Sequence, residues 1–127
     1  MTKEYIHTDK APSAIGAYSQ AVKFNDVVYL SGQIPLDPEK MVLISDDINI
    51  QIKQVFTNLS NVLNAAGSSL GEIIKLNVYL TNLEHFSKVN KHMEKIFEKP
   101  YPARAAIGIK ELPKGALIEI DAIARSK

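Results

Sequence analysis

The sequence predicts an α+β domain in which a mixed sheet carries two helices on one of its faces. Segments in which apolar side chains alternate with a period of two lie at both ends of the chain and in its middle. Two segments with helical spacing of apolar residues separate them, so the predicted order is β-β-α-β-α-β-β. Two helices are too few to cover both faces of so wide a sheet, so we expect both on the same face.

The first two long strands are predicted to form a hairpin. Residues 17–24 and 27–34 flank Asn25 and Asp26, a pair that suits a tight turn. A short additional strand near residues 5–7 fits the same pattern. Prolines at 35 and 38 then interrupt any strand ladder and indicate a turn.

From Asp47 onward the apolar residues take a helical period, which predicts the first helix. Its apolar positions are Ile48, Ile52, Val55, Phe56, Leu59, Val62, Leu63 and Ala66. Asp46 and Asp47 place negative charge at the start, where the helix dipole favours it. Gly67 follows the last apolar residue, the position typical of a C-terminal cap.

The middle strand and the second helix follow directly. In residues 74–81, the side chains of Ile74, Leu76, Val78 and Leu80 share one face. The second helix then presents one apolar face, made of Leu83, Phe86, Val89 or Asn90, Met93 and Phe97.

The sequence ends with two predicted strands, residues 104–110 and 116–125, joined by a turn that holds Pro113 and Gly115. We expect the core to receive Ala105, Ile107 and Ile109 from the first strand and Ile118, Ile120, Ala122 and Ala124 from the second. Arg104, Ala106 and Gly108 would then share the opposite face with Leu117, Glu119, Asp121 and Ile123. A face that mixes charged, small and apolar residues predicts cover by another copy of the chain.

Arg104 is the residue on that face that most needs a partner, because a guanidinium is costly to bury alone. Two interpretations are open. It binds a ligand carboxylate in bidentate fashion at a subunit boundary, or it forms a structural ion pair with Glu119 or Asp121. On alternation alone, neither is preferred.

Bulk composition narrows the classes of function. We expect one domain, residues 1–127, from the length. The 15 basic and 14 acidic residues give a net charge of +1, which argues against a nucleic-acid partner or an anionic membrane surface. There is no cysteine, no apolar run of membrane-spanning length (~20 residues), and no third ligand near His85 and His92, so we expect no metal, no membrane partner and a cytoplasmic location.

Several motifs, in order, carry a resemblance to a known family. The segments "APSAIGAYSQAV", "YLSGQIPLDP", "PYPARAAI" and "LPKGALIEIDAIA" resemble the RidA (YjgF/YER057c/UK114) family, over about residues 11–124. The resemblance implies a chorismate-mutase-like fold assembled as a homotrimeric barrel, with helices outside and clefts between subunits. It also implies hydrolysis of 2-iminobutanoate and 2-iminopropanoate, released by pyridoxal-phosphate dehydratases, to 2-keto acids and ammonia, without a cofactor.

The resemblance also implies roles for individual residues. Arg104 matches the arginine that binds the substrate carboxylate, and Glu119 matches the glutamate that orients or activates water. Tyr18, Ser31 and Gly32 match residues lining the pocket, and backbone groups near Ala106 would receive the imine nitrogen. Asn90 matches a family position to which we assign a structural or supporting role.

The chain departs from the family pattern at three places. Ala106 replaces a frequent cysteine, Ala17 replaces a proline, and residues 38–43 lack a frequent glycine. Two other functions stay open: an endoribonuclease or translation inhibitor, and a non-catalytic ligand-binding or holdase trimer. The near-neutral charge weighs against the first.

Overall fold

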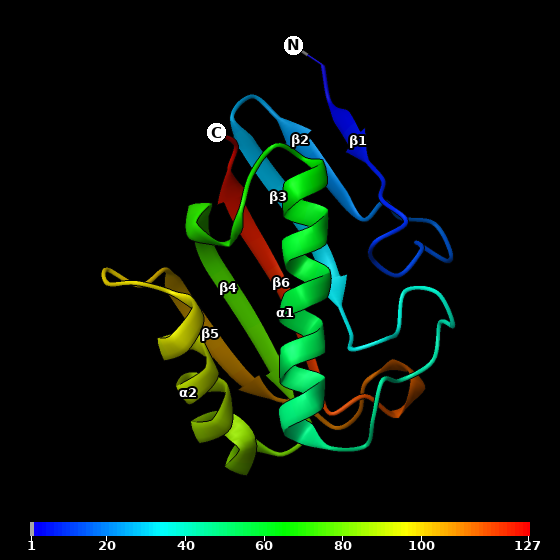
Figure 1. Ribbon diagram of the computed structural model, residues 1–127, viewed down its shortest axis with the longest axis vertical. Helices are drawn as coiled ribbons and strands as arrows, with labels where there is room; N and C mark the ends of the chain where they lie inside the picture. The colour runs from blue at the N-terminus through cyan, green and yellow to red at the C-terminus, as the bar shows by residue number, and fades with distance from the viewer. Residues whose placement is uncertain (1) are drawn as a thin grey trace.

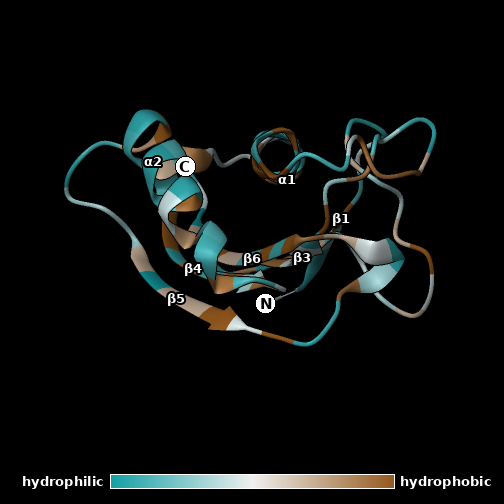
Figure 2. Cartoon of the chain, turned by 90° about the horizontal axis from the view of Figure 1, so that it is seen from below, coloured by the Kyte–Doolittle hydropathy of each residue, from teal (hydrophilic) through white to brown (hydrophobic). Residues whose placement is uncertain are grey.

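Six strands and two helices build the protein, as a computed structural model that describes residues 2–127 shows. The sheet has the order β1-β2-β3-β6-β4-β5, and both helices lie on one of its faces (Figures 1 and 2). The strands are β1 (Glu4–Ile6), β2 (Ala21–Phe24), β3 (Val27–Gln33), β4 (Ile73–Leu80), β5 (Ala103–Gly108) and β6 (Ile118–Arg125). The helices are α1 (Ile48–Ala65) and α2 (Phe86–Ile96). The predicted fold class and element order are confirmed.

Helix α1 begins and ends where its sequence predicts. The Asp47 carboxylate accepts hydrogen bonds from the backbone N–H groups of Asn49 (2.8 Å) and Ile50 (3.2 Å), which α1 itself cannot satisfy. At the other end Gly67 adopts a φ of +74°, the left-handed conformation that terminates many helices. The apolar face between these ends packs on the sheet.

A bulge in β4 makes one sequence expectation wrong. The register between β4 and β6 shifts between Ile73 and Lys75. Ile73 is therefore buried, and Ile74, expected to point into the core, is 50% exposed. Beyond the bulge, Leu76, Val78 and Leu80 are fully buried, as their alternation predicts.

Strand β5 has the expected alternation but the opposite orientation. It pairs in parallel with β4, reached through the crossover helix α2, and β4 separates it from β6. The Arg104 side chain hydrogen-bonds to α2, and a Cβ on Gly108 would lie 2.9 Å from Leu83 Cγ, just before that helix. The helical side thus receives Arg104, Ala106 and Gly108. Ile107, expected in the core, points to the helix-free face and is 45% exposed.

The core lies between the helices and the sheet. Its fully buried side chains include Ile52, Leu59 and Leu63 of α1 and, from β6, Ile118 and Ile120. The opposite residues of β6, Glu119, Asp121 and Ile123, are half-buried on the helix-free face, as predicted. Neither helix in the described part of the chain is long and apolar enough to cross a membrane.

Candidate functional site

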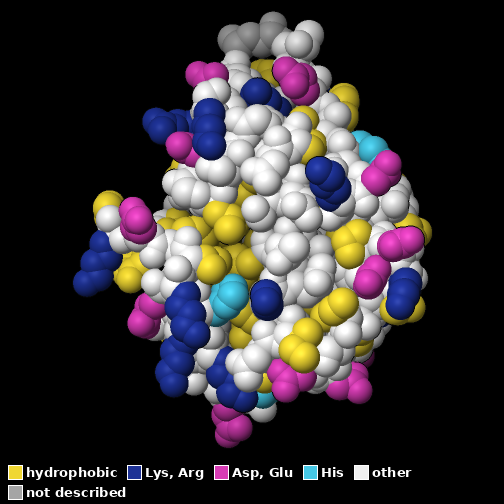
Figure 3. Space-filling view, in the orientation of Figure 1, with side chains coloured by type: hydrophobic (Ala, Val, Ile, Leu, Met, Phe, Trp, Pro, Cys, Tyr) yellow, Lys and Arg dark blue, Asp and Glu magenta, His cyan; other side chains and the backbone are white. Residues whose placement is uncertain are grey.

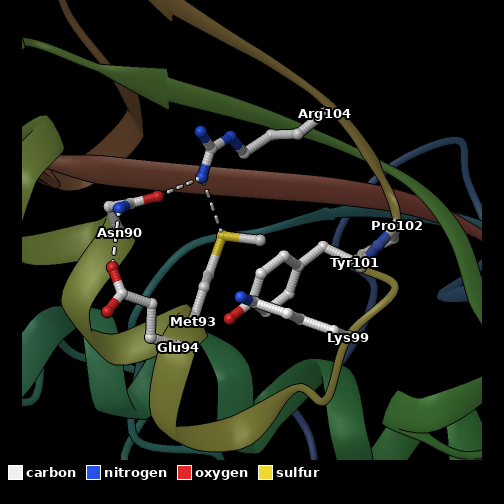
Figure 4. A pocket seen from close by; sticks show the side chains of 7 residues that line it. All are labelled: Asn90, Met93, Glu94, Lys99, Tyr101, Pro102 and Arg104. Carbon is white, nitrogen blue, oxygen red and sulfur yellow. Dashed lines mark hydrogen bonds between the residues drawn. The ribbon is translucent and has the colours of Figure 1, made fainter.

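The predicted site residues other than Ala106 lie around two separate hollows in the chain, and Ala106 lines neither of them. The first, the Arg104 hollow, has a volume of about 610 Å³ and lies between α2 and the segment leading into β5 (Figure 4). Its lining residues are Asn90, Met93, Glu94, Lys99, Tyr101, Pro102 and Arg104. Sequence reasoning named Arg104 and Asn90 here; it had no pattern to place residues 99–102 beside α2.

The Arg104 guanidinium is held by side chains of α2. Its Nη1 donates a hydrogen bond to Asn90 Oδ1 (2.9 Å) and lies 3.6 Å from Met93 Sδ. Its Cζ lies 4.6 Å from the centroid of the Phe86 ring, a cation–π contact. Asn90 in turn donates through Nδ2 to Glu94 Oε1 (2.9 Å), which fixes the orientation of its amide (Figure 4). The guanidinium is therefore oriented before any ligand arrives.

Arg104 does not form the structural ion pair that alternation left open. Among residues 2–127, the ion pairs are His7 with Asp9 and Arg125 with Glu72. Neither Glu119 nor Asp121 reaches Arg104, because β4 lies between the two strands and the side chains point to opposite faces. Within the same residues, Nε and Nη2 of Arg104 have no hydrogen-bond partner. Both N–H groups are thus available to a planar anion.

The second hollow, the Glu119 hollow, brings together four predicted residues. Tyr18, Ser31, Gly32 and Glu119 share a space of about 620 Å³ where β3 leaves the sheet. Its other lining residues are Pro12, Ser13, Ile15, Gln33, Ile34, Leu36, Met41, Pro113 and Lys114. Apolar walls with a few polar groups are the usual anatomy of a small-molecule site.

Met41 is the lining residue that sequence reasoning missed most clearly. Its backbone adopts a φ of +58°, which is uncommon for a bulky residue. This conformation lies in the loop where the sequence lacks the glycine frequent in the resembling family. That missing glycine was the available signal, since another residue must then adopt the left-handed turn.

Gly32 lies so close to Glu119 that a side chain at position 32 would displace the Glu119 carboxyl. The register between β3 and β6 shifts between Leu30 and Gln33, and a Cβ on Gly32 would lie 2.5 Å from Glu119 Oε2. Beside it, Ser31 Oγ donates to the Ser19 carbonyl (2.6 Å), which ties the bulge to the segment carrying Tyr18. The bulge thus leaves room for the Glu119 carboxyl at the floor of the hollow.

The electrostatic surroundings of Glu119 favour its neutral form. Burial raises the pKa of the Glu119 carboxyl above its ordinary 4.5, and the neighbouring negative charge of Asp121 raises it further. Asp121 is itself fixed, because Oδ1 accepts from Asn77 Nδ2 (2.8 Å) and Oδ2 accepts from the Tyr79 hydroxyl (2.9 Å). The hydrogen bond from the Tyr79 hydroxyl to Asp121 is the main cause that raises the pKa of Tyr79, and burial is the second. Glu119 is therefore a candidate for proton transfer nearer neutral pH than an ordinary carboxyl.

One chain does not bring the two hollows together. Arg104 lies on the helical side of the sheet with Ala106, whereas Glu119 lies on the helix-free side, two strands away. The expectation that Arg104 and Glu119 share a face is therefore wrong for a single chain. In the described residues, no three His, Asp or Glu side chains are grouped in a way that could hold a metal ion.

Comparison with known protein families gives one match over nearly the whole chain. The model of a family described as Endoribonuclease L-PSP matches residues 8–126. All lining residues of both hollows, from Pro12 to Glu119, lie within the matched range.

Individual relatives are similar over almost their full length. A RutC family protein of Pyrococcus abyssi is 44% identical, over 98% of this chain and 98% of the relative. A 2-iminobutanoate/2-iminopropanoate deaminase of Dermatophagoides farinae is 39% identical, over 95% of this chain and 94% of the relative. The crystal structure of RidA from Psychrobacter sp. PAMC 21119 superposes with a TM-score of 0.92 at 46% identity, covering 96% of this chain and 98% of that one.

Proposed function

Because the chain belongs to the Endoribonuclease L-PSP family, which includes RidA and YjgF, we propose that it is an imine deaminase. Its substrates are small 2-imino acids such as 2-iminobutanoate and 2-iminopropanoate, and its products are the 2-keto acid and ammonia. The name of the Dermatophagoides farinae relative supports this choice among the activities of the family.

The observation that carries the proposal is that the Arg104 guanidinium is oriented by its neighbours and still has N–H groups without a partner. Asn90, Met93 and Phe86 orient its guanidinium, while Nε and Nη2 have no partner among residues 2–127. A guanidinium with two free parallel N–H groups suits a carboxylate, and such charge-assisted hydrogen bonds contribute about 1.5–3 kcal/mol each. Every 2-imino acid carries a carboxylate next to the reacting carbon, so binding at Arg104 fixes that carbon in place.

The complete site forms between copies of the chain in a homotrimer. Arg104 and Glu119 lie on opposite faces of one sheet, so they contact one small ligand only if they come from different chains. The helix-free face, with Tyr29 at 49% and Ile107 at 45% exposure, supplies apolar surface for such contacts. Arg104 of one chain then closes the Glu119 hollow of its neighbour.

Within this site Glu119 directs water to the imine carbon. It takes a proton from water as the oxygen bonds to C2 of the protonated imine, giving a tetrahedral amino alcohol. Glu119 returns this proton to the nitrogen and then takes the hydroxyl proton, so that the C=O bond forms as the C–N bond breaks and ammonia leaves. The ammonia takes up the last proton as ammonium, which restores the Glu119 carboxylate. A carboxyl whose pKa is raised by burial and Asp121 both accepts and returns this proton, help typically worth ~10²–10⁴-fold in rate.

The other lining residues bind rather than react. Tyr18 and Ser31 line the hollow beside Glu119, and backbone groups near Ala106 receive the imine nitrogen from the Arg104 side. The apolar walls accept the substrate side chain. Imine hydrolysis needs no covalent nucleophile, so Ala106 in place of a cysteine is compatible with it.

The test generates 2-iminobutanoate in situ with a threonine dehydratase and traps the remaining imine with semicarbazide. We expect wild-type protein to lower the trapped imine, and both Arg104→Ala and Arg104→Lys to lose that effect, because an ammonium cannot reproduce bidentate binding. Unchanged thermal unfolding and oligomeric mass of the variants exclude misfolding as the cause. Full activity in Arg104→Ala would refute the proposal.

A further inference from the structure

The helical layer contains a third hollow, and the ionisable residues that line it are all basic. It lies between α1 and α2, has a volume of about 400 Å³, and is lined by Asn49, Ile52, Lys88, Lys91, His92 and Lys95. His92 also lines the adjoining hollow, to which Lys53 of α1 belongs. We call this region, defined by Lys53, Lys88, Lys91, His92 and Lys95, the basic groove. Figure 3 shows lysine and arginine side chains around a histidine on this face.

The sequence of α2 does not indicate that its lysines and its glutamate lie on different sides of the helix. Along the sequence, Glu94 lies between Lys91 and Lys95, and such a mixture of signs is typical of a solvated helix face. In the fold, Glu94 lies on the far side of the helix, where its carboxylate accepts a hydrogen bond from Asn90 in the Arg104 hollow. The lysines remain on the side toward α1. All ionisable residues that line the basic groove are therefore basic.

Among residues 2–127, no ion pair neutralises the charge of the basic groove. The ion pairs of residues 2–127 involve His7 and Arg125, and none involves a lysine. Lysines spaced three, four and seven residues apart on one helix face repel one another, which destabilises the helix. Such an arrangement is stabilised by a bound anion, which removes the repulsion.

His92 lies half-buried in the middle of this charge. Its ring centroid is 5.3 Å from that of Phe56, which holds the imidazole between the helices. Burial lowers the pKa of His92, and the positive charges of Lys95 and then Lys53, from the two facing helices, lower it further. Lysines of α1 and of α2 thus both act on His92.

We propose that the basic groove binds a small molecule that carries two or more phosphate charges. Lysine ammonium groups bind phosphate as compact point charges, and several of them line this one groove, which suits a ligand with more than one negative charge. The volume fits a small molecule. Helix α2 has only 11 residues, about 16 Å at 1.5 Å per residue, which is short for a polymer track.

This site is independent of imine hydrolysis. The basic groove is lined by residues of α1 and α2, and none of its defining residues lines the Arg104 hollow or the Glu119 hollow. Glu94 and Asn90 separate it from Arg104 on α2. Substitutions in the groove are therefore expected to leave imine hydrolysis unchanged, and a failure of either proposal leaves the other standing.

The test measures pyrophosphate binding by calorimetry on the full chain at constant ionic strength. The variant Lys91→Gln/Lys95→Gln is compared with Lys3→Gln/Lys10→Gln, which removes the same charge from exposed lysines near the N-terminus. We expect one pyrophosphate per chain in the wild type, at least a tenfold weaker affinity in the groove variant, and less than a twofold change in the control. Equal losses in both variants, or no saturable binding to wild type, would overturn the proposal.

A second readout follows the histidines by NMR. Bound pyrophosphate stabilises the imidazolium of His92, so its pKa should rise, while His7, exposed and beside Asp9, serves as the reference. An unmoved His92 contradicts the site. A short single-stranded RNA that binds and is not displaced by pyrophosphate would also contradict it, since a polymer site would then occupy this face.

Discussion

At the scale of single residues, Gly32 decides where the Glu119 carboxyl lies. A Cβ at this position would lie 2.5 Å from Glu119 Oε2, so Gly32→Ala must displace the carboxyl. We expect the variant to lose activity by at least about tenfold, toward the ~10²–10⁴-fold that a general base supplies. The measurement is kcat/KM in the coupled imine assay.

Gly71→Ala is the matched control for this prediction. The nearest atom to a Cβ on Gly71 is Ser69 Oγ at 4.0 Å, so the added methyl meets no obstacle. We expect near wild-type kcat/KM and an unchanged oligomeric mass. If Gly32→Ala matched this control in activity, Glu119 would not need its present position.

Asp121 provides a prediction about pH. Its negative charge raises the pKa of Glu119, so Asp121→Asn should lower that pKa while keeping the shape that Asn77 and Tyr79 contact. The acidic limb of the kcat/KM–pH profile should therefore move to lower pH. A general loss of activity with an unmoved limb would assign Asp121 a purely structural role.

The raised pKa of Glu119 also predicts how the free energy of unfolding depends on pH. A carboxyl whose pKa is raised in the folded state binds more protons there than in the unfolded state. The contribution of Glu119 to the free energy of unfolding thus falls as the pH rises from its ordinary 4.5 through the raised value. In Asp121→Asn this loss should be smaller, as urea unfolding at several pH values can measure.

At the scale of elements, helix α1 depends on one side chain for its start. Asp47 accepts two backbone hydrogen bonds, whereas Asp46 accepts none among residues 2–127. We expect Asp47→Ala to lower the free energy of unfolding by about 1 kcal/mol and Asp46→Ala to change it little. Chemical denaturation of both variants tests this. Equal effects would mean that charge near the helix dipole, and not the cap, stabilises this end.

Element types were predictable from the sequence because each rests on local periodicity and capping. The face of β5 was not, because alternation gives two faces without saying which one meets the helices. That choice depends on β5 pairing in parallel with β4 after a crossover, which brings Arg104 to α2. The bulge that exposes Ile74 was likewise set by pairing with β6.

The candidate site was predictable in the same uneven way. Tyr18, Ser31, Gly32 and Glu119 line one hollow of the single chain, whereas Arg104, which the resemblance places in the same pocket, lines another. In the sequence, Phe86 and Met93 are only apolar residues of a predicted helix face, because nothing local indicates that an arginine rests on them. Contacts between distant segments are what the sequence pattern leaves open.

At the scale of the whole molecule, the proposed trimer makes a prediction that does not depend on a trimer structure. Arg104→Ala and Glu119→Gln should each be inactive, yet co-assembled they should regain activity, because a site works when each chain supplies its intact residue. With random mixing in a cyclic trimer, each site is intact with a probability of one half times one half, about a quarter of wild-type activity.

Light scattering checks the assembly, and the imine assay checks the activity of the mixture. Wild type mixed with either variant gives the reference for dilution. Inactivity of the mixed assemblies would place both residues of a working site in one chain, which the opposite faces of the sheet do not allow without rearrangement.

The central position of β6 has a consequence for how the chain is made. This strand lies between β3 and β4, although it follows β3 by more than 80 residues. Until β6 has emerged from the ribosome, β3 and β4 each lack the strand that pairs with them on one side. Their apolar side chains then cannot become part of a complete sheet. The sheet of the nascent polypeptide is therefore completed only after β6 has emerged from the ribosome.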